Sequence, residues 1–171
     1  MKLLSIIAFG LAVAGGMAST FVSAQGIDDE FDNRQWSELV LTLPAYPKTE
    51  NLVKIWVSAA SNNTFLVDTE SISVGEDGVI RYTLVVKSDS GAMNVSYEGM
   101  RCDSIENKRF AFGHPDNTWA KARNSTWLRI RENGLNRQHA ELFKNYFCPY
   151  GVSQRTAKDA VEVLKRGGIK Y

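Results

Sequence analysis

Basic and aromatic residues are interleaved along residues 108–137, which gives this stretch the strongest chemical character in the chain. Seven basic residues stand there against two acidic ones, among four aromatic side chains: Phe110, Phe112, Trp119 and Trp127. Charge and stacking together bind nucleic acids or anionic glycans. The alternative, which we favour, is that the aromatic rings pack in the core while the basic residues face solvent along strands. The candidate ligand-binding residues are Lys121, Arg123, Trp127, Arg129, Arg131, Arg137 and His139.

An acidic segment lies far upstream of this stretch. Between residues 28 and 38 it carries five acidic residues and only Arg34 as a base. Folded over residues 108–137, it would neutralise their positive charge within the same molecule. The sequence leaves open whether this contact forms.

Motifs for nucleophilic or metal-dependent catalysis are absent from the sequence. It contains no Gly-x-Ser-x-Gly, Ser-x-x-Lys or His-Glu-x-x-His pattern, and only two histidines. We therefore assign no catalytic residue, cofactor or metal. The sequence favours a protein that is not an enzyme, without deciding the question.

His139 is the residue on which an enzymatic alternative depends. One hypothesis is a small hydrolase that uses Asn136-Arg137-Gln138-His139 together with Tyr97 and Glu98, with His139 as a general base near Glu141 or Asn136. The favoured interpretation is a packed histidine that bonds a backbone carbonyl. Arg137 and His139 are two residues apart and point to different faces of a helix, which weakens a shared site.

The first residues have the layout of a secretory signal peptide. Lys2 precedes an apolar stretch from Leu3 to Ala18, and Val22-Ser23-Ala24 predicts cleavage before Gln25. Without Lys2, the remaining chain has no net charge. Neither cysteine lies at the cleavage point, so we expect an exported protein that is not a lipoprotein. No later stretch of the sequence is long and apolar enough to predict a membrane span.

Cys102 and Cys148 are the only two cysteines. In an exported protein, such a pair predicts one disulfide, and no third cysteine can compete for it. Cys-x-x-Cys is absent, which argues against a thioredoxin-type redox site. On a chain-entropy model, a bridge closing a loop of this length contributes about 4 kcal/mol.

Alternating hydrophobicity predicts a series of short antiparallel strands. Tight turns are expected at residues 75–78 and 88–91, where glycine and aspartate cluster. Ile80, Tyr82, Leu84 and Val86 share one face, as do Met93, Val95 and Tyr97 in the next strand. The predicted strands are residues 39–43, 52–60, 64–68, 79–87, 93–101, 108–113 and 126–131.

Helical periodicity replaces this alternation after Glu132. One helix is predicted to begin near Asn133 and to end before Pro149, with a second over residues 157–166 capped by Thr156. Strands followed by helices predict an α+β fold: an antiparallel β-meander with two C-terminal helices on one face and one disulfide. The expected organisation is a signal peptide (1–24), an acidic and proline-containing arm (25–50) and a single α+β domain (51–171).

Many short motifs occur in an order that resembles the cryptic neisserial protein (CNP-one-like) family of secreted proteobacterial proteins. They include Arg81-Tyr82-Thr83-Leu84-Val85, Asn94-Val95-Ser96-Tyr97-Glu98-Gly99, Arg101-Cys102, Asn136-Arg137-Gln138-His139-Ala140 and Tyr146-Phe147-Cys148. The resemblance covers nearly all of the chain after the leader. It implies a periplasmic protein and carries no activity with it. Some family members look like lipoproteins, from which this chain departs.

The leading functional hypothesis is a non-catalytic binding or accessory module of the periplasm. Its partner is unknown, with another envelope protein or an anionic ligand as the expected kinds. The small hydrolase is the first alternative, and an anionic-ligand binder that uses residues 108–137 is the second.

Overall fold

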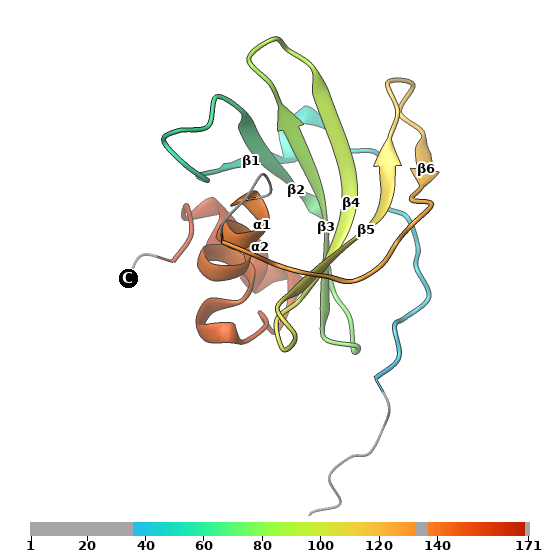
Figure 1. Ribbon diagram of the computed structural model, residues 1–171, viewed down its shortest axis with the longest axis vertical. Helices are drawn as coiled ribbons and strands as arrows, with labels where there is room; N and C mark the ends of the chain where they lie inside the picture. Colours follow the sequence, from blue (N-terminus) through green and yellow to red (C-terminus); the bar gives the residue numbers. More distant parts are fainter. Residues whose placement is uncertain (1–35, 133–136, 170–171) are drawn as a thin grey trace, which may run out of the picture. The chain divides into compact units, whose positions relative to one another are not determined.

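A six-stranded antiparallel meander forms the centre of the protein, as seen in the computed structural model, which describes residues 36–132 and 137–169. Each strand pairs with the next in the chain (Figure 1). The short β7 (Leu128–Arg129) pairs with the first residues of β5, whereas β6 pairs with its last residues. The six strands are β1 (Leu52–Ile55), β2 (Thr64–Val74), β3 (Val79–Lys87), β4 (Met93–Arg101), β5 (Glu106–Gly113) and β6 (Trp119–Lys121).

Both predicted glycine turns are confirmed. Gly78 donates its N–H to the carbonyl of Gly75 at 3.0 Å, and Gly91 donates to Ser88 at 2.9 Å. Gly78 and Gly91 have φ values of 73° and 83°, in the left-handed region that residues with a Cβ rarely adopt. These turns allow β2, β3 and β4 to reverse direction within a few residues.

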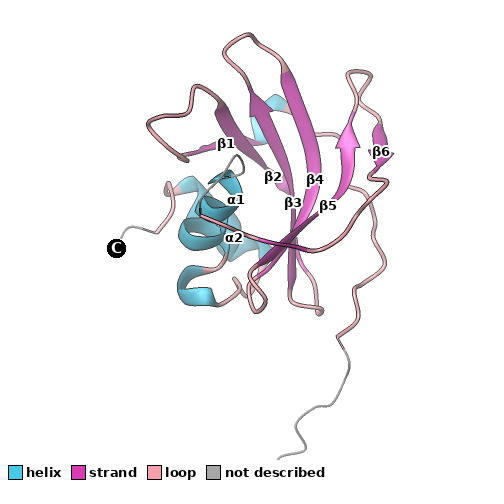
Figure 2. Ribbon diagram, in the orientation of Figure 1, coloured by secondary structure: helices cyan, strands magenta, loops and turns pink. Residues whose placement is uncertain are grey.

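Two helical segments cover one face of the sheet (Figure 2). α1 (Arg137–Glu141) continues directly into a π-helical turn, η2 (Leu142–Phe147). A 3₁₀ turn, η3 (Pro149–Gly151), then leads to α2 (Ala157–Lys165), whose first turn is closed by the predicted cap Thr156 in a reciprocal pair of hydrogen bonds with Asp159. Another 3₁₀ turn, η1 (Thr49–Asn51), precedes β1.

The main core lies between the sheet and these helices. Tyr82 and Leu84 on β3 are fully buried against Leu142 and Phe147 of η2. The rings of Tyr82 and Phe147 lie 4.8 Å apart. Cys102 and Cys148 form the predicted disulfide at the edge of this core. The α+β fold with two helices on one face is therefore confirmed.

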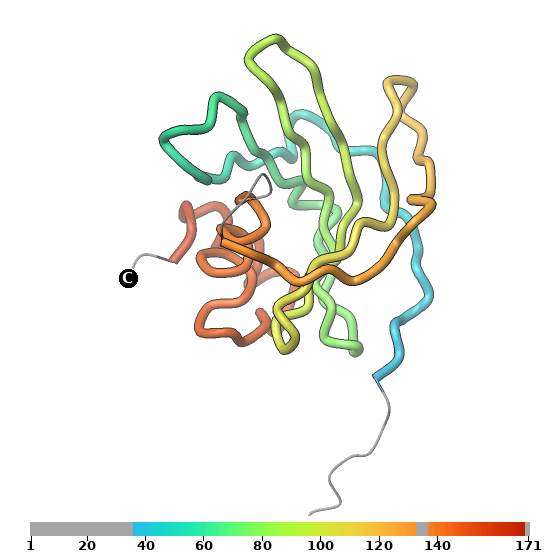
Figure 3. The backbone as a smooth tube through the Cα atoms, in the orientation of Figure 1, coloured from blue at the N-terminus to red at the C-terminus, as the bar shows by residue number. Residues whose placement is uncertain are grey.

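The opposite face of the sheet is also covered, which the sequence did not predict. Residues 36–48 run along it as an extended segment (Figure 3). Leu41 and Leu43 pack there against Tyr97 and Phe110. The predicted strand 39–43 is wrong, because this segment lies over the face of the sheet and pairs with no strand edge. Tyr97 therefore points away from the helices.

Other strand boundaries also differ from the predictions. The strand predicted over residues 52–60 ends at Ile55, and β6 was not predicted. β2 continues beyond Asp68 to Val74 through a register shift between Asp68 and Ser73, which interrupts the alternation. Only Leu128 and Arg129 of the predicted strand 126–131 pair with β5. None of the helices within residues 36–132 and 137–169 has the length and apolar character needed to cross a membrane.

Candidate functional site

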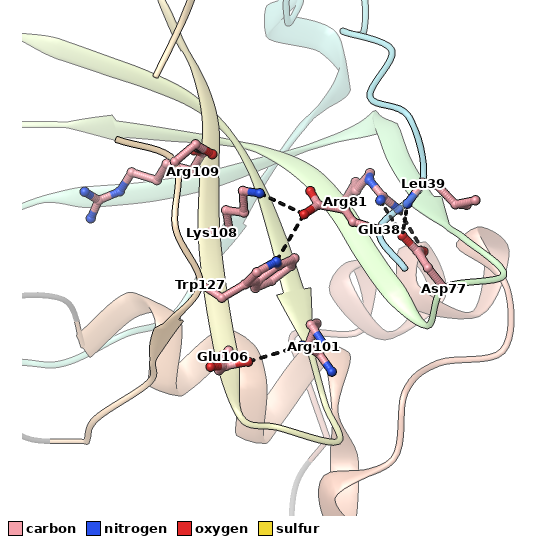
Figure 4. Close-up of polar contacts among 10 residues, drawn as sticks. Glu38, Leu39, Asp77, Arg81, Arg101, Glu106, Lys108, Arg109 and Trp127 are labelled. Atoms are coloured by element: carbon pink, nitrogen blue, oxygen red, sulfur yellow. Dashed lines mark hydrogen bonds and ion pairs between the residues drawn. The ribbon is translucent and has the colours of Figure 1, made fainter. Parts of the chain in front are cut away.

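Glu38 holds the N-terminal segment against two residues of the basic stretch. Its Oε2 atom lies 2.8 Å from Nζ of Lys108 and accepts a hydrogen bond from Nε1 of Trp127 at 3.2 Å (Figure 4). Lys108 lies on β5, and Trp127 lies directly before β7, which pairs with β5. The acidic segment and the basic stretch therefore meet at Glu38, while the acidic residues 28–32 lie outside the described residues.

Trp36 and Asp77 extend this contact along the same face. Trp36 donates its Nε1–H to the carbonyl of Asp77 at 2.8 Å, and the guanidinium of Arg101 lies 3.9 Å above its ring. Asp77 accepts the N–H of Leu39 and pairs with Arg81 at 2.6 Å (Figure 4). Burial raises the pKa of Asp77, but these donors outweigh it and hold that pKa below its ordinary value.

Replacing Glu38 is expected to loosen the segment while the domain stays folded. Glu38→Gln removes the charge opposite Lys108 in a half-buried pair, for an expected loss of about 0.5–1 kcal/mol of unfolding free energy. Hydrogen exchange at the Leu39 amide should become faster than in the parent protein. Glu50→Gln, at an exposed acidic residue of η1, is the matched control. Unchanged exchange at Leu39 would show that Glu38 does not hold the segment.

A buried polar cluster lies on the other face of the sheet, centred on Glu98 of β4. Glu98 is only 1% exposed and its Oε2 lies 2.7 Å from Nε2 of His139. Tyr82 donates to the same oxygen at 3.2 Å, and Ser96 donates to Oε1 at 2.7 Å. Nε of Arg109, which points to the opposite side of β5 from Lys108 (Figure 4), lies 3.6 Å from Oε1. The carboxylate therefore has partners on both oxygens.

This environment keeps Glu98 ionised. Burial alone raises the pKa of a carboxyl group, since a charge is disfavoured away from water. Here the attraction and hydrogen bond of His139, with smaller contributions from Ser96 and Arg109, outweigh burial and lower the pKa of Glu98 below its ordinary value. Burial, followed by the charge of Glu98, raises the pKa of Tyr82 well above its ordinary value, so Tyr82 stays a hydrogen-bond donor.

The order of groups in the cluster differs from that of a hydrolytic triad. A triad places the histidine between the hydroxyl and the acid, because the imidazole must take the hydroxyl proton. Here the carboxylate of Glu98 lies between Ser96 and His139 and accepts from the serine. His139 itself is only 2% exposed. The cluster is built to join α1 to β4.

The structure confirms that His139 is buried but gives it a different partner from the predicted ones. Its partner is the side chain of Glu98, so the favoured interpretation of a bond to a backbone carbonyl identified burial correctly and the partner wrongly. Tyr97 faces the N-terminal segment and does not join His139. Glu141 accepts instead from Asn145, and Asn136 lies outside the described residues.

An open hollow of about 440 Å³ lies beside the disulfide, between the helical segment and the residues around β7. Its apolar lining includes Ile105, Ile130, Phe143 and Cys148. The other described residues of its lining are Arg129, Glu132, Ala140, Lys144, Tyr150 and Gly151. Volumes of this size are typical of small-molecule sites. A smaller hollow of about 100 Å³ adjoins it, sharing Glu132, Ala140 and Lys144 and adding Arg137.

The structure separates the candidate ligand-binding residues into distinct places. Trp127 is half-buried on the far face, and His139 is enclosed at Glu98. Lys121 and Arg123 are exposed at and after β6, which pairs with the end of β5 opposite to that paired by β7. Arg129 lines the hollow beside the disulfide and Arg137 lines the smaller one, whereas the exposed Arg131 is in the lining of neither.

Sequence reasoning missed most of the lining of the hollow beside the disulfide. Ile105, Phe143 and Tyr150 carry no recognisable motif, and only their positions next to Cys102 and Cys148 could have drawn attention to them. Within the described ranges, no group of three or more histidine, cysteine or acidic side chains could hold a metal ion.

Comparison with known proteins identifies the family. The model of the CNP1-like family matches residues 31–165. The chain belongs to this family. Cryptic neisserial protein 1 of Neisseria gonorrhoeae (strain ATCC 700825 / FA 1090) is similar to this CNP1-like chain, at 29% identity over 159 residues that cover 84% of the chain and 78% of that protein. No solved structure matches it. The resemblance expected from the short motifs is therefore confirmed, and neither name states a reaction or a ligand.

Proposed function

We propose that this CNP1-like protein is a non-catalytic binding module of the periplasm. Residues 1–24 would direct its export as a signal peptide and would then be cleaved off. The observation that carries the proposal is the open hollow beside the Cys102–Cys148 bridge. Its wall combines apolar side chains with a few charged ones, as binding sites do. The disulfide and the packed helical segment keep this wall in one shape before any ligand arrives, which lowers the entropy lost on binding.

The geometry of Glu98 and His139 favours binding over hydrolysis. A general base needs access to the proton that it removes. His139 is enclosed and its Nε2 atom is engaged by Glu98. Any turnover of p-nitrophenyl esters, phosphates or glycosides by the purified protein is therefore expected to be equal in the parent and in His139→Asn. Turnover that disappears in a folded His139→Asn variant would replace this proposal with the hydrolase.

Photo-crosslinking in whole cells tests the binding role. A benzophenone amino acid at Tyr150, on the rim of the hollow, should give a discrete covalent product. Adding Ala140→Trp, which fills the hollow, should remove that product. The same amino acid at the exposed Asn62, in the β1–β2 loop, is the control. Products that are equal at both positions, or that persist with Ala140→Trp, would contradict a binding role for the hollow.

The export step gives a separate prediction. Mass spectrometry of the protein from the periplasm should find an N-terminus at Gln25, either free or cyclised to pyroglutamate. An intact Met1 or a lipid-modified terminus would contradict it.

A further inference from the structure

We propose that the hollow beside the disulfide binds an amphiphilic anion, a molecule with an apolar chain and a carboxylate or phosphate head. This inference rests on the proposed binding function and names its ligand class. The chain would lie on Ile105, Ile130 and Phe143, and the head would lie at Arg129.

Backbone strain gathers at this hollow. Three non-glycine residues of the described part have positive φ: Ile105 at 57°, Asn117 at 65° and Tyr150 at 56°. Asparagine tolerates this conformation, but a β-branched or aromatic residue is strained in it. Both strained residues, Ile105 and Tyr150, line the hollow. A glycine or asparagine would adopt the same φ without strain. We therefore infer that Ile105 and Tyr150 occupy these positions because their side chains line the hollow.

A π-helical turn shapes the facing wall. Cys148 donates its N–H to the carbonyl of Phe143, five residues earlier, at 2.8 Å. Such turns are rare and occur frequently at functional sites, because the extra residue re-aims the side chains around it. Here the turn directs Phe143 and Lys144 into the wall and places Cys148 at the bridge. The wall therefore departs from regular structure on both sides of the hollow.

The charges of the wall favour an anion. Among the described residues of the lining, Arg129 and Lys144 are basic and Glu132 is acidic. Glu132 and Lys144 also line the smaller hollow, together with Arg137 and Glu141, so acid and base are balanced there. Arg129 then remains as the basic residue of the hollow beside the disulfide. Glu106 lies opposite Arg129 in the register of β5 and β7, but its carboxylate is engaged by Arg101 at 3.5 Å, and Arg129 takes part in none of the ion pairs found among the described residues. Its planar guanidinium suits a carboxylate or phosphate, which it can hold through two parallel hydrogen bonds.

Calorimetric titration with four probes tests the ligand class. Decanoate and decyl phosphate should bind. Decyltrimethylammonium has the same chain with the opposite charge, and inorganic phosphate has the charge without the chain, so both should bind at least about tenfold more weakly. Comparing decanoate with decyl phosphate identifies the preferred head. Methyl resonances of Ile105 and Ile130 should shift with decanoate.

Two variants separate the head from the chain. Arg129→Gln should weaken decanoate about tenfold and leave decyltrimethylammonium unchanged, whereas Lys158→Gln, at an exposed base on α2, should change neither. Ile105→Asn removes apolar lining and relieves the strained φ, so it should weaken decanoate in a protein that stays folded. Equal binding of decanoate and decyltrimethylammonium, or equal effects of Arg129→Gln and Lys158→Gln, would overturn the proposal. A discrete Tyr150 crosslink that Ala140→Trp removes would then leave the binding function standing with a different ligand.

Discussion

Replacing both Cys102 and Cys148 with serine is expected to lower the free energy of unfolding by about 2–5 kcal/mol. The bridge joins the residue after β4 to the residue after η2, across a sequence separation of 46. Without it, the unfolded chain gains the freedom that the closed loop had removed. The segment formed by α1 and η2 also loses its disulfide cross-link to the end of β4. Urea denaturation of the parent and the variant gives the difference directly.

A second variant separates the bridge from the chemistry of serine. Cys102 and Cys148 are 5% and 1% exposed, so a serine hydroxyl at either position is buried and adds its own cost. The alanine pair, Cys102→Ala with Cys148→Ala, avoids that cost and should still lose at least about 2 kcal/mol. Thiol labelling of the unfolded, unreduced parent should find no free cysteine. Two reactive thiols, or an alanine pair as stable as the parent, would exclude the bridge as a stabilising element.

His139→Ala is expected to cost about 3–5 kcal/mol of unfolding free energy, because it leaves the ionised Glu98 buried without the partner that contributes most to keeping it charged. Glu98→Gln removes the charge and keeps a side chain of the same shape, so it should cost less than His139→Ala. Combining the two changes should cost less than the sum of the single effects, since both act on one contact. Additive effects would show that Glu98 and His139 do not stabilise each other.

The acid side of the stability profile provides an independent measure of the same cluster. The pKa of Glu98 is lower in the folded protein than its ordinary value of 4.5. Its contribution is therefore fully present above that value and is lost as pH falls from 4.5 through the folded pKa. The difference in unfolding free energy between the parent and Glu98→Gln should shrink over this window. A difference that stays constant between neutral and strongly acid pH would contradict the lowered pKa.

The meander could be predicted from sequence because its signals are local. Gly78 and Gly91 mark turns whose conformation glycine favours, and Tyr82 and Leu84 alternate with residues of the other face. The second helix was predicted closely for the same reason, since Thr156 and Gly167 act within their own turns. Local alternation fails where both faces of a strand are covered. Tyr97 is buried, but against the N-terminal segment, and nothing in its own strand distinguishes the two faces.

The polar cluster could be predicted only in part. His139 was expected to be buried from its place on the apolar face of a helix, and Glu98 was named beside it in the hydrolase alternative. Their direct contact spans 41 residues of sequence and depends on how α1 lies on the sheet, which no local pattern specifies. The hollow was missed for a different reason. Ile105 and Tyr150 adopt conformations that their residue types disfavour, so propensity points away from the structure at these positions.

The N-terminal segment has a consequence for the order of folding. Its anchoring bonds from Trp36 and Glu38 reach partners 41, 70 and 89 residues later in the chain. Neighbouring strands of the meander pair across short turns, so they close small loops and can form early. The segment that is synthesised before the sheet must wait until β5 and Trp127 are in place. It is therefore expected to be the last part to lock down during folding and the first to open in the native state.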